Sequence, residues 1–237
     1  MTASLWVGLL AVQSWSIHHG RRPLHRLAGR ASLVLFPLFW TSGLLIVQMM
    51  ARGFATADNH FHTIFGARLT PVDILTSACT LYLYHLAVSR RREVLVHAAA
   101  MLAILLFLLS PIIVRLLQIG GPLAIRGPDQ YYKFAYELEL SNLLSILIGL
   151  WLYSRRPRTA WPFLIAAAAV VAQSLAFETV GRTPAWEAAV RAIAALPTIA
   201  VAVAGVMISA LAVWHAWTAR KPNIGSAEAI TPRPGLV

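Results

Sequence analysis

Apolar residues run through this chain in long, almost unbroken stretches rather than in alternation. Seven stretches have nearly the length of a membrane span: Met1–Ile17, Ala31–Ala51, Leu69–Ser89, Val94–Leu117, Phe134–Ser154, Thr159–Val180 and Ala192–Trp217. A helical span needs about 20 mostly apolar residues. In membrane-spanning strands, apolar and polar residues would alternate instead. In lipid the backbone N–H and C=O groups must bind each other, and a single continuous apolar segment achieves this as a helix. We therefore predict an all-α, polytopic membrane helix bundle of about seven transmembrane helices within residues 1–219.

The composition agrees with lipid as the solvent. Of the 237 residues, 58% are hydrophobic and only 12% are charged, against about 25% charged in a typical soluble domain. The first apolar stretch has no positive residues before it, unlike a secretory signal, so we expect a mature membrane helix there. Residues 220–237 contain few apolar side chains and several breakers, and we expect a disordered cytoplasmic tail.

The net charge of +11 is not evenly distributed. When alternate connections are assigned to opposite sides, one side receives 13 Lys and Arg with 2 acids, and the other receives 7 of each. The positive-inside rule then predicts that the basic side is cytoplasmic, with the N-terminus outside and the C-terminus inside. We expect a multi-pass protein of the cell inner membrane. Membrane lipid is a sufficient partner for the basic side, and nucleic acid is not needed to explain it.

Histidines gather on the same basic side. Six of the eight map there: His18, His19, His25, His85, His97 and His215. Two imidazoles on facing helices can clamp a haem iron, and arginines can pair with haem propionates. The candidate cofactor, a b-type haem or a quinone near the cytoplasmic face, would use His18, His19, His85, His97, Arg21 and Arg22. The alternative is that these histidines lie at the headgroup level and bind nothing.

Ionisable residues also occur near the opposite side, within or beside the spans. They are Asp73, Glu137, Glu178, Arg115 and Arg191. Charges at membrane depth are costly and usually face the bundle interior. They therefore define a candidate substrate site in an acid-rich outer half. The alternative is that they pair with one another and hold helices together. Pro37, Pro111 and Pro197 are expected to kink the second, fourth and seventh spans.

Two stretches carry a family resemblance: "HHGRRPLHRLAGR", followed by an uncharged span, and "VHAAAMLAILLFLLSPIIVRLL". They resemble an uncharacterised family of bacterial multi-pass membrane proteins with an HR-x-x-G-R loop and a His-x-x-x-Met helix ending in Arg. The matching positions are His18 or His19, His25, Arg26, Gly29, Arg30, His97, Met101 and Arg115. The resemblance implies that these residues form a set, and it implies no established activity.

Three functions remain open at this stage. The first is a redox-type membrane protein that binds a b-type haem or a quinone. The second is a transporter or small-molecule-binding membrane protein that uses the acid-rich outer half. The third is a non-enzymatic subunit or assembly factor in a complex with other membrane subunits. The sequence contains no nucleotide-binding loop, nucleophile motif or retinal-type lysine within the spans, and it does not decide whether the protein is an enzyme.

Overall fold

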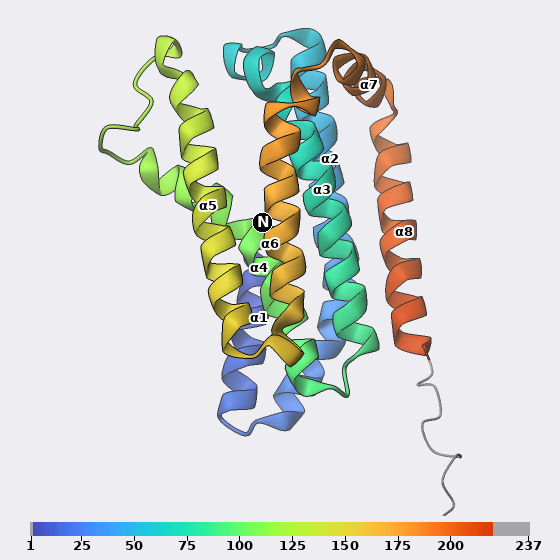
Figure 1. Ribbon diagram of the computed structural model, residues 1–237. Coiled ribbons are helices and arrows are strands. Elements are labelled where there is room, and N and C mark those ends of the chain that lie inside the picture. The colour runs from blue at the N-terminus through green and yellow to red at the C-terminus, as the bar shows by residue number, and fades with distance from the viewer. Residues whose placement is uncertain (1, 220–237) are drawn as a thin grey trace, which may run out of the picture.

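The computed structural model describes residues 2–219, which fold into helices joined mostly by short turns (Figure 1). In chain order the elements are α1 (Thr2–His18), α2 (Arg22–Thr56), α3 (His60–Ser89), α4 (Val94–Leu117), the 3-10 turn η1 (Pro128–Gln130), α5 (Tyr132–Arg155), α6 (Pro157–Glu178), the 3-10 turn η2 (Val180–Arg182), α7 (Pro184–Ala195) and α8 (Thr198–Thr218). The prediction of an all-α fold is confirmed.

Within residues 2–219, six helices are long and apolar enough to cross a membrane: α2, α3, α4, α5, α6 and α8. The chain therefore has the character of a multi-pass membrane protein. With 17 residues, α1 is about 26 Å long at 1.5 Å per residue, which is the lower limit for a span. A seventh span through α1 stays a prediction.

The helices run up and down, so that successive connections alternate between two ends of the bundle (Figure 1). We call the end with the α1–α2, α3–α4 and α5–α6 turns the basic end. The opposite end, with the α2–α3 and α4–α5 connections, is the α7 end, because α7 lies across it. α6 packs against α3, α4 and α5, whereas α8 stands at one edge against α2 and α3. The predicted charge asymmetry was obtained by assigning alternate connections to opposite sides, and the connections do alternate in this way.

The connection after the first apolar stretch is much shorter than expected. Most of "HHGRRPLHRLAGR" is helical, because α2 begins at Arg22 and only His19–Arg21 lie outside helices. Pro23 stands in the first turn of α2, where its missing N–H is no loss. Gly20 makes the reversal with φ +68°, a left-handed conformation that glycine adopts without strain. The HR-x-x-G-R motif is thus the start of a helix and not a loop.

The predicted seventh span, Ala192–Trp217, is wrong at its beginning. α7 ends at Ala195, and α8 begins only at Thr198. Leu196 and Pro197 between them are extended, with ψ 141° and 130°. The reason is that a residue before proline is driven out of the helical region. Pro197 therefore separates two helices, whereas Pro37 and Pro111 lie inside α2 and α4 as predicted.

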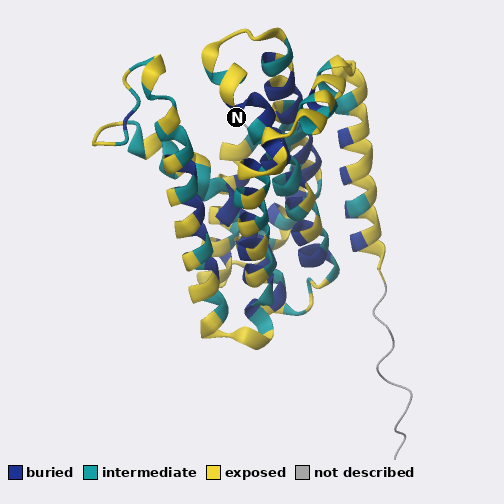
Figure 2. Ribbon diagram, turned by 45° about the horizontal axis from the view of Figure 1, so that its top comes forward, coloured by how far each residue is buried: buried dark blue, intermediate teal, exposed yellow. Residues whose placement is uncertain are grey.

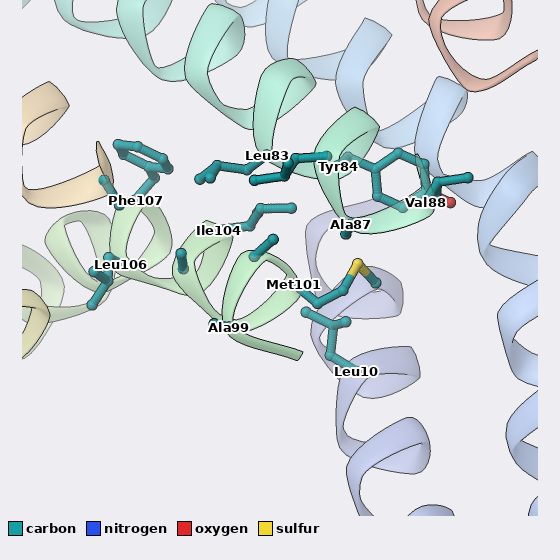
Figure 3. Close-up of a cluster of buried hydrophobic side chains, with 14 of the residues drawn as sticks. Leu10, Leu83, Tyr84, Ala87, Val88, Ala99, Met101, Ile104, Leu106 and Phe107 are labelled. Atoms are coloured by element: carbon teal, nitrogen blue, oxygen red, sulfur yellow. The ribbon is translucent and has the colours of Figure 1, made fainter. Parts of the chain in front are cut away.

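The main core lies where α1, α2, α3, α4 and α6 meet. Phe36 and Tyr84 stack with centroids 3.7 Å apart, and Trp6 packs edge-on against Tyr84. Leu83, Met101 and Ile104 extend this cluster, as Figure 3 shows. The outward faces remain apolar and exposed (Figure 2). Such faces would promote aggregation in water but are solvated by lipid.

Candidate functional site

The most unusual polar residue is Glu137 at the α7 end. It lies on α5, and its side chain is fully buried. One carboxylate oxygen, Oε2, accepts a hydrogen bond from Gln118 Nε2, while Oε1 is buried without a partner. Gln118 is held in turn, because its Oε1 accepts from the backbone N–H of Ile125 at 3.1 Å. No cation forms an ion pair with Glu137 within residues 2–219.

A pocket of about 470 Å³ lies beside this pair. It is bounded by α3, the end of α4, the α4–α5 connection and the start of α5. Its lining residues are Phe61, Val114, Gln118, Ile125, Arg126, Gly127, Pro128, Tyr131 and Phe134. Phe61 and Phe134 meet edge to face with centroids 5.0 Å apart. The pocket thus combines aromatic faces, which attract cations, with Gln118, whose amide donates a hydrogen bond to the Glu137 carboxylate.

A second polar cluster at the α7 end is built around Arg68. Its Nη2 donates to Glu178 Oε1 at 3.0 Å, and Arg182 binds the other carboxylate oxygen of Glu178. The Arg68 guanidinium also lies 4.0 Å from the centroid of the Phe177 ring. The cluster joins α3 to α6 and η2. Arg68 and Glu178 each have a partner of opposite charge, although Arg68 Nε is buried without a hydrogen-bond partner. The geometry of the cluster is that of a structural link.

The five predicted substrate-site residues do not form one site. Glu137 and Glu178 belong to separate clusters. Arg115 donates to the carbonyl of Pro111 in its own helix at 2.8 Å, and Arg191 lies on α7, 4.7 Å from the Phe54 ring centroid. Asp73 lies deeper on α3 and makes no hydrogen bond to any part of residues 2–219. Within residues 2–219, Arg115 and Arg191 therefore form no ion pair with Glu137 or Glu178, and the role of these five residues in substrate binding stays a prediction.

Several polar residues deeper in the bundle link helices to each other. Ser110 on α4 donates to Asn142 Oδ1, and Asn142 Nδ2 donates to Ser174 on α6, both at 3.0 Å. Gln173 Nε2 donates to Thr76 on α3 at 2.9 Å. Hydrogen bonds of this kind hold helices together in lipid. These side chains therefore fit the alternative interpretation, in which polar residues within the spans bind one another and hold the helices together.

The histidines at the basic end do not converge. His18 and His19 are exposed; His19 Nδ1 donates to the Trp15 carbonyl of its own helix at 2.9 Å. His97 Nδ1 donates to the carbonyl of Ala87 on α3 at 2.8 Å. His18 and His19 make no hydrogen bond to His85 or His97. His85 instead meets His215 on α8, with 3.0 Å between Nε2 and Nδ1.

This arrangement bears on the haem hypothesis. Two axial imidazoles need their nitrogens about 4 Å apart across an iron, twice a typical metal–nitrogen bond. The His85–His215 nitrogens are closer than this and bind each other. Within residues 2–219 no three His, Cys, Asp or Glu side chains are grouped to hold a metal ion. Of the two predicted propionate partners, Arg21 lies over the Trp15 ring, 5.4 Å from its centroid, and Arg22 begins α2.

Sequence reasoning missed some of the residues that complete these clusters. Gln118 was overlooked because it follows the last apolar turn of α4, and nothing in its neighbours marks it. Arg68 and Arg182 were counted only for topology. The i, i+4 spacing of Glu178 and Arg182 is a readable signal of a helical ion pair. The His85–His215 contact joins positions 130 apart, and no local pattern reveals such a pair.

Comparisons with known proteins provide no identity. No protein-family model matches the chain, and neither the curated proteins nor the solved structures contain a match.

Proposed function

We propose that this membrane protein binds a small organic molecule in the pocket beside Gln118 and Glu137. The observation that carries the proposal is Glu137 itself. Its carboxylate is fully buried, one oxygen has no partner, and the other is held by a residue that lines the pocket. A buried polar atom without a hydrogen-bond partner lowers the stability of the fold. Proteins commonly retain such a loss of stability at functional sites.

The lining indicates the ligand class. Aromatic faces from Phe61, Tyr131 and Phe134 favour an aromatic or cationic group. The carboxylate behind Gln118 favours a hydrogen-bond donor with positive charge. Arg126 is exposed, so its charge faces solvent at the rim. We therefore propose a small aromatic amine or a related hydrophobic cation as the ligand, either as a bound effector or as a transported substrate.

A thermal-unfolding screen in detergent tests this proposal. Phenylethylamine and tryptamine should raise the unfolding temperature in proportion to the logarithm of their concentration, while benzoate should not. Glu137→Gln should abolish the rise and still fold, since the amide has nearly the same shape. Glu187→Gln on α7 is the matched control and should behave as wild type. Stabilisation by benzoate alone, or an undiminished response of Glu137→Gln, would refute the proposal.

We further propose that the chain crosses the inner membrane seven times, with α1 as the first span, the N-terminus outside and the C-terminus in the cytoplasm. The distribution of charge supports this topology. Among residues 2–219, Glu93 is the one acid at the basic end, where ten arginines lie. A phosphatase fused after Val237 should be inactive, and a fluorescent protein fused there should be bright. An active phosphatase would contradict this orientation.

A second candidate is a b-type haem or quinone site at the basic end. One observation favours it: the His97 Nδ1–H is held by the Ala87 carbonyl, which leaves Nε2 as the free nitrogen. Ligating histidines are commonly held in this way by a backbone carbonyl. Gently purified protein from haem-replete cells should then show a Soret band that is lost in His97→Gln. Colourless wild-type protein would exclude the haem version of this candidate.

A further inference from the structure

His85 and His215 form a direct imidazole–imidazole hydrogen bond between α3 and α8. The two nitrogens are 3.0 Å apart, the rings are 16° from parallel, and their centroids are 5.3 Å apart. The centroid separation exceeds the N···N distance by roughly two ring radii. The rings therefore meet edge to edge, nearly in one plane, and not face to face. One nitrogen must carry the proton and the other must accept it.

The pair lies at the basic end of α8, which packs against α2 and α3. The buried residues of α8 are mostly small: Gly205, Ser209, Val213 and Ala216. At the α7 end, Gln48 and Arg52 donate to the Leu196 carbonyl just before the helix, at 2.7 and 2.9 Å.

At the basic end, apart from His85, Arg91 donates to the Trp217 carbonyl at 3.2 Å and to the Ala216 carbonyl at 3.5 Å. Polar contacts at both ends of α8 therefore add to its packing against the bundle.

Most charges near the pair are positive. α4 also packs against α3 here and brings the titratable His97 to the Ala87 carbonyl. α3 continues into Arg90, Arg91 and Arg92, and Arg90 is already paired with Glu93. The facing part of α2 carries Arg22, His25, Arg26 and Arg30, and α8 carries no other titratable residue. The helices α2, α3 and α8 together contain one acid, Asp73. It lies on α3, 12 residues and therefore about 18 Å from His85. No carboxylate is at hand to neutralise a charged pair.

We propose that His85 and His215 form a pH-sensitive clasp that holds the basic end of α8 against α3. With no proton or one proton added, an N–H of one ring still donates to a bare nitrogen of the other. When both rings are protonated, both facing nitrogens carry hydrogen and both rings are cationic, so the bond is replaced by repulsion. Imidazole is the side chain that takes up a proton near physiological pH. Acidification of that side therefore releases the end of α8.

Spin labels at the two helix ends test the clasp directly. The full chain, with Cys79→Ala and labels at Ser89→Cys and Thr218→Cys, is placed in nanodiscs with a chelator, since paired imidazoles can also bind metal ions. Pulsed dipolar spectroscopy should give one label–label distance above about pH 7 and an added, longer distance below about pH 5. The change should reverse when the pH is raised, which distinguishes it from unfolding.

Two variants separate the clasp from a general effect of acid. In His215→Gln the amide can still accept from His85, even when His85 is protonated, so the single short distance should persist at low pH. His19→Gln, which alters an exposed histidine, should respond as wild type does. A wild-type distance that does not change between about pH 7 and pH 5 would overturn the proposal. An unaltered acid response in His215→Gln would also overturn it.

Discussion

The two ends of this bundle handle charge in opposite ways. At the basic end, arginines outnumber acids and mostly make local contacts; Arg90 and Glu93, for example, form an exposed pair three residues apart. At the α7 end, acids and bases are balanced, and one ion pair joins distant elements. Arg68 reaches Glu178 from another helix with only 15% of its own side chain exposed. An aromatic pocket also lies at this end.

The difference shows how one composition can serve two purposes. Charges that set orientation need only be present on the correct side, so they can stay solvated and loosely held. A buried charge without a full set of partners is costly, so it is commonly retained only where function needs it; Glu137, with one unpartnered oxygen, is such a group. Burial and partnership at each charge therefore indicate its role better than its abundance does. By this criterion the proposed site belongs to the α7 end.

The largest effect is expected from backbone packing at the α7 end. A Cβ at Gly66 on α3 would lie 2.7 Å from Phe54 Cβ and 3.0 Å from the Met50 carbonyl on α2. Gly66→Val should cost about 1–3 kcal/mol of stability through overpacking, measured as a lower unfolding temperature in detergent. Gly8→Val on α1 is the control, because nothing lies within 4 Å of that Cβ. Equal losses in both variants would mean that this end is no more tightly packed.

An intermediate effect is expected from the ion pairs. Arg68→Met removes a half-buried pair and the contact with the Phe177 ring, and should cost about 1–2 kcal/mol. Arg90→Met removes the exposed pair at the basic end and should change stability by no more than about 0.5 kcal/mol. Thermal unfolding of the two variants in parallel measures the difference. If Arg90→Met proved the more destabilising, the proposed contrast between the ends would fail.

The smallest effect is expected from the first two histidines. His18→Gln and His19→Gln change exposed side chains whose contacts lie within α1 and its end. Each variant should keep its unfolding free energy within about 0.5 kcal/mol of wild type. Equilibrium unfolding gives this value. A loss of several kcal/mol would show that the basic end contains a histidine site after all.

Much of the helical framework is readable from the sequence, because lipid requires long apolar stretches. Val94–Leu117 is predicted to the residue. The failure at Ala192–Trp217 has a local cause: Pro197 forces Leu196 out of the helix. Ala192–Trp217 is mostly apolar along its whole length, so its hydrophobicity does not reveal that the helix is interrupted at Leu196 and Pro197. α7 carries Glu187 and Arg191, and that charge was the available signal that it does not continue the span.

The candidate site was less predictable. Glu137 was recognised because a carboxyl between apolar turns is conspicuous, but its partner Gln118 comes from a connection with no periodicity. Arg115 and Arg191 have the right charge and lie at the right end, yet neither forms an ion pair with Glu137. Side-chain direction and the path of a connection decide such contacts, and both depend on tertiary packing. Of the residues around the proposed site, the sequence therefore pointed to Glu137 but not to Gln118.

Cysteine accessibility tests the central claim, that the pocket opens on the side of the membrane opposite to the basic end, most directly. In a Cys79→Ala background, Arg126→Cys at the rim and Arg92→Cys on the α3–α4 turn are exposed to a membrane-impermeant maleimide. Intact spheroplasts should label Arg126→Cys at once, and Arg92→Cys only after permeabilisation. Labelling of Arg92→Cys in intact spheroplasts, with Arg126→Cys protected, would contradict the account.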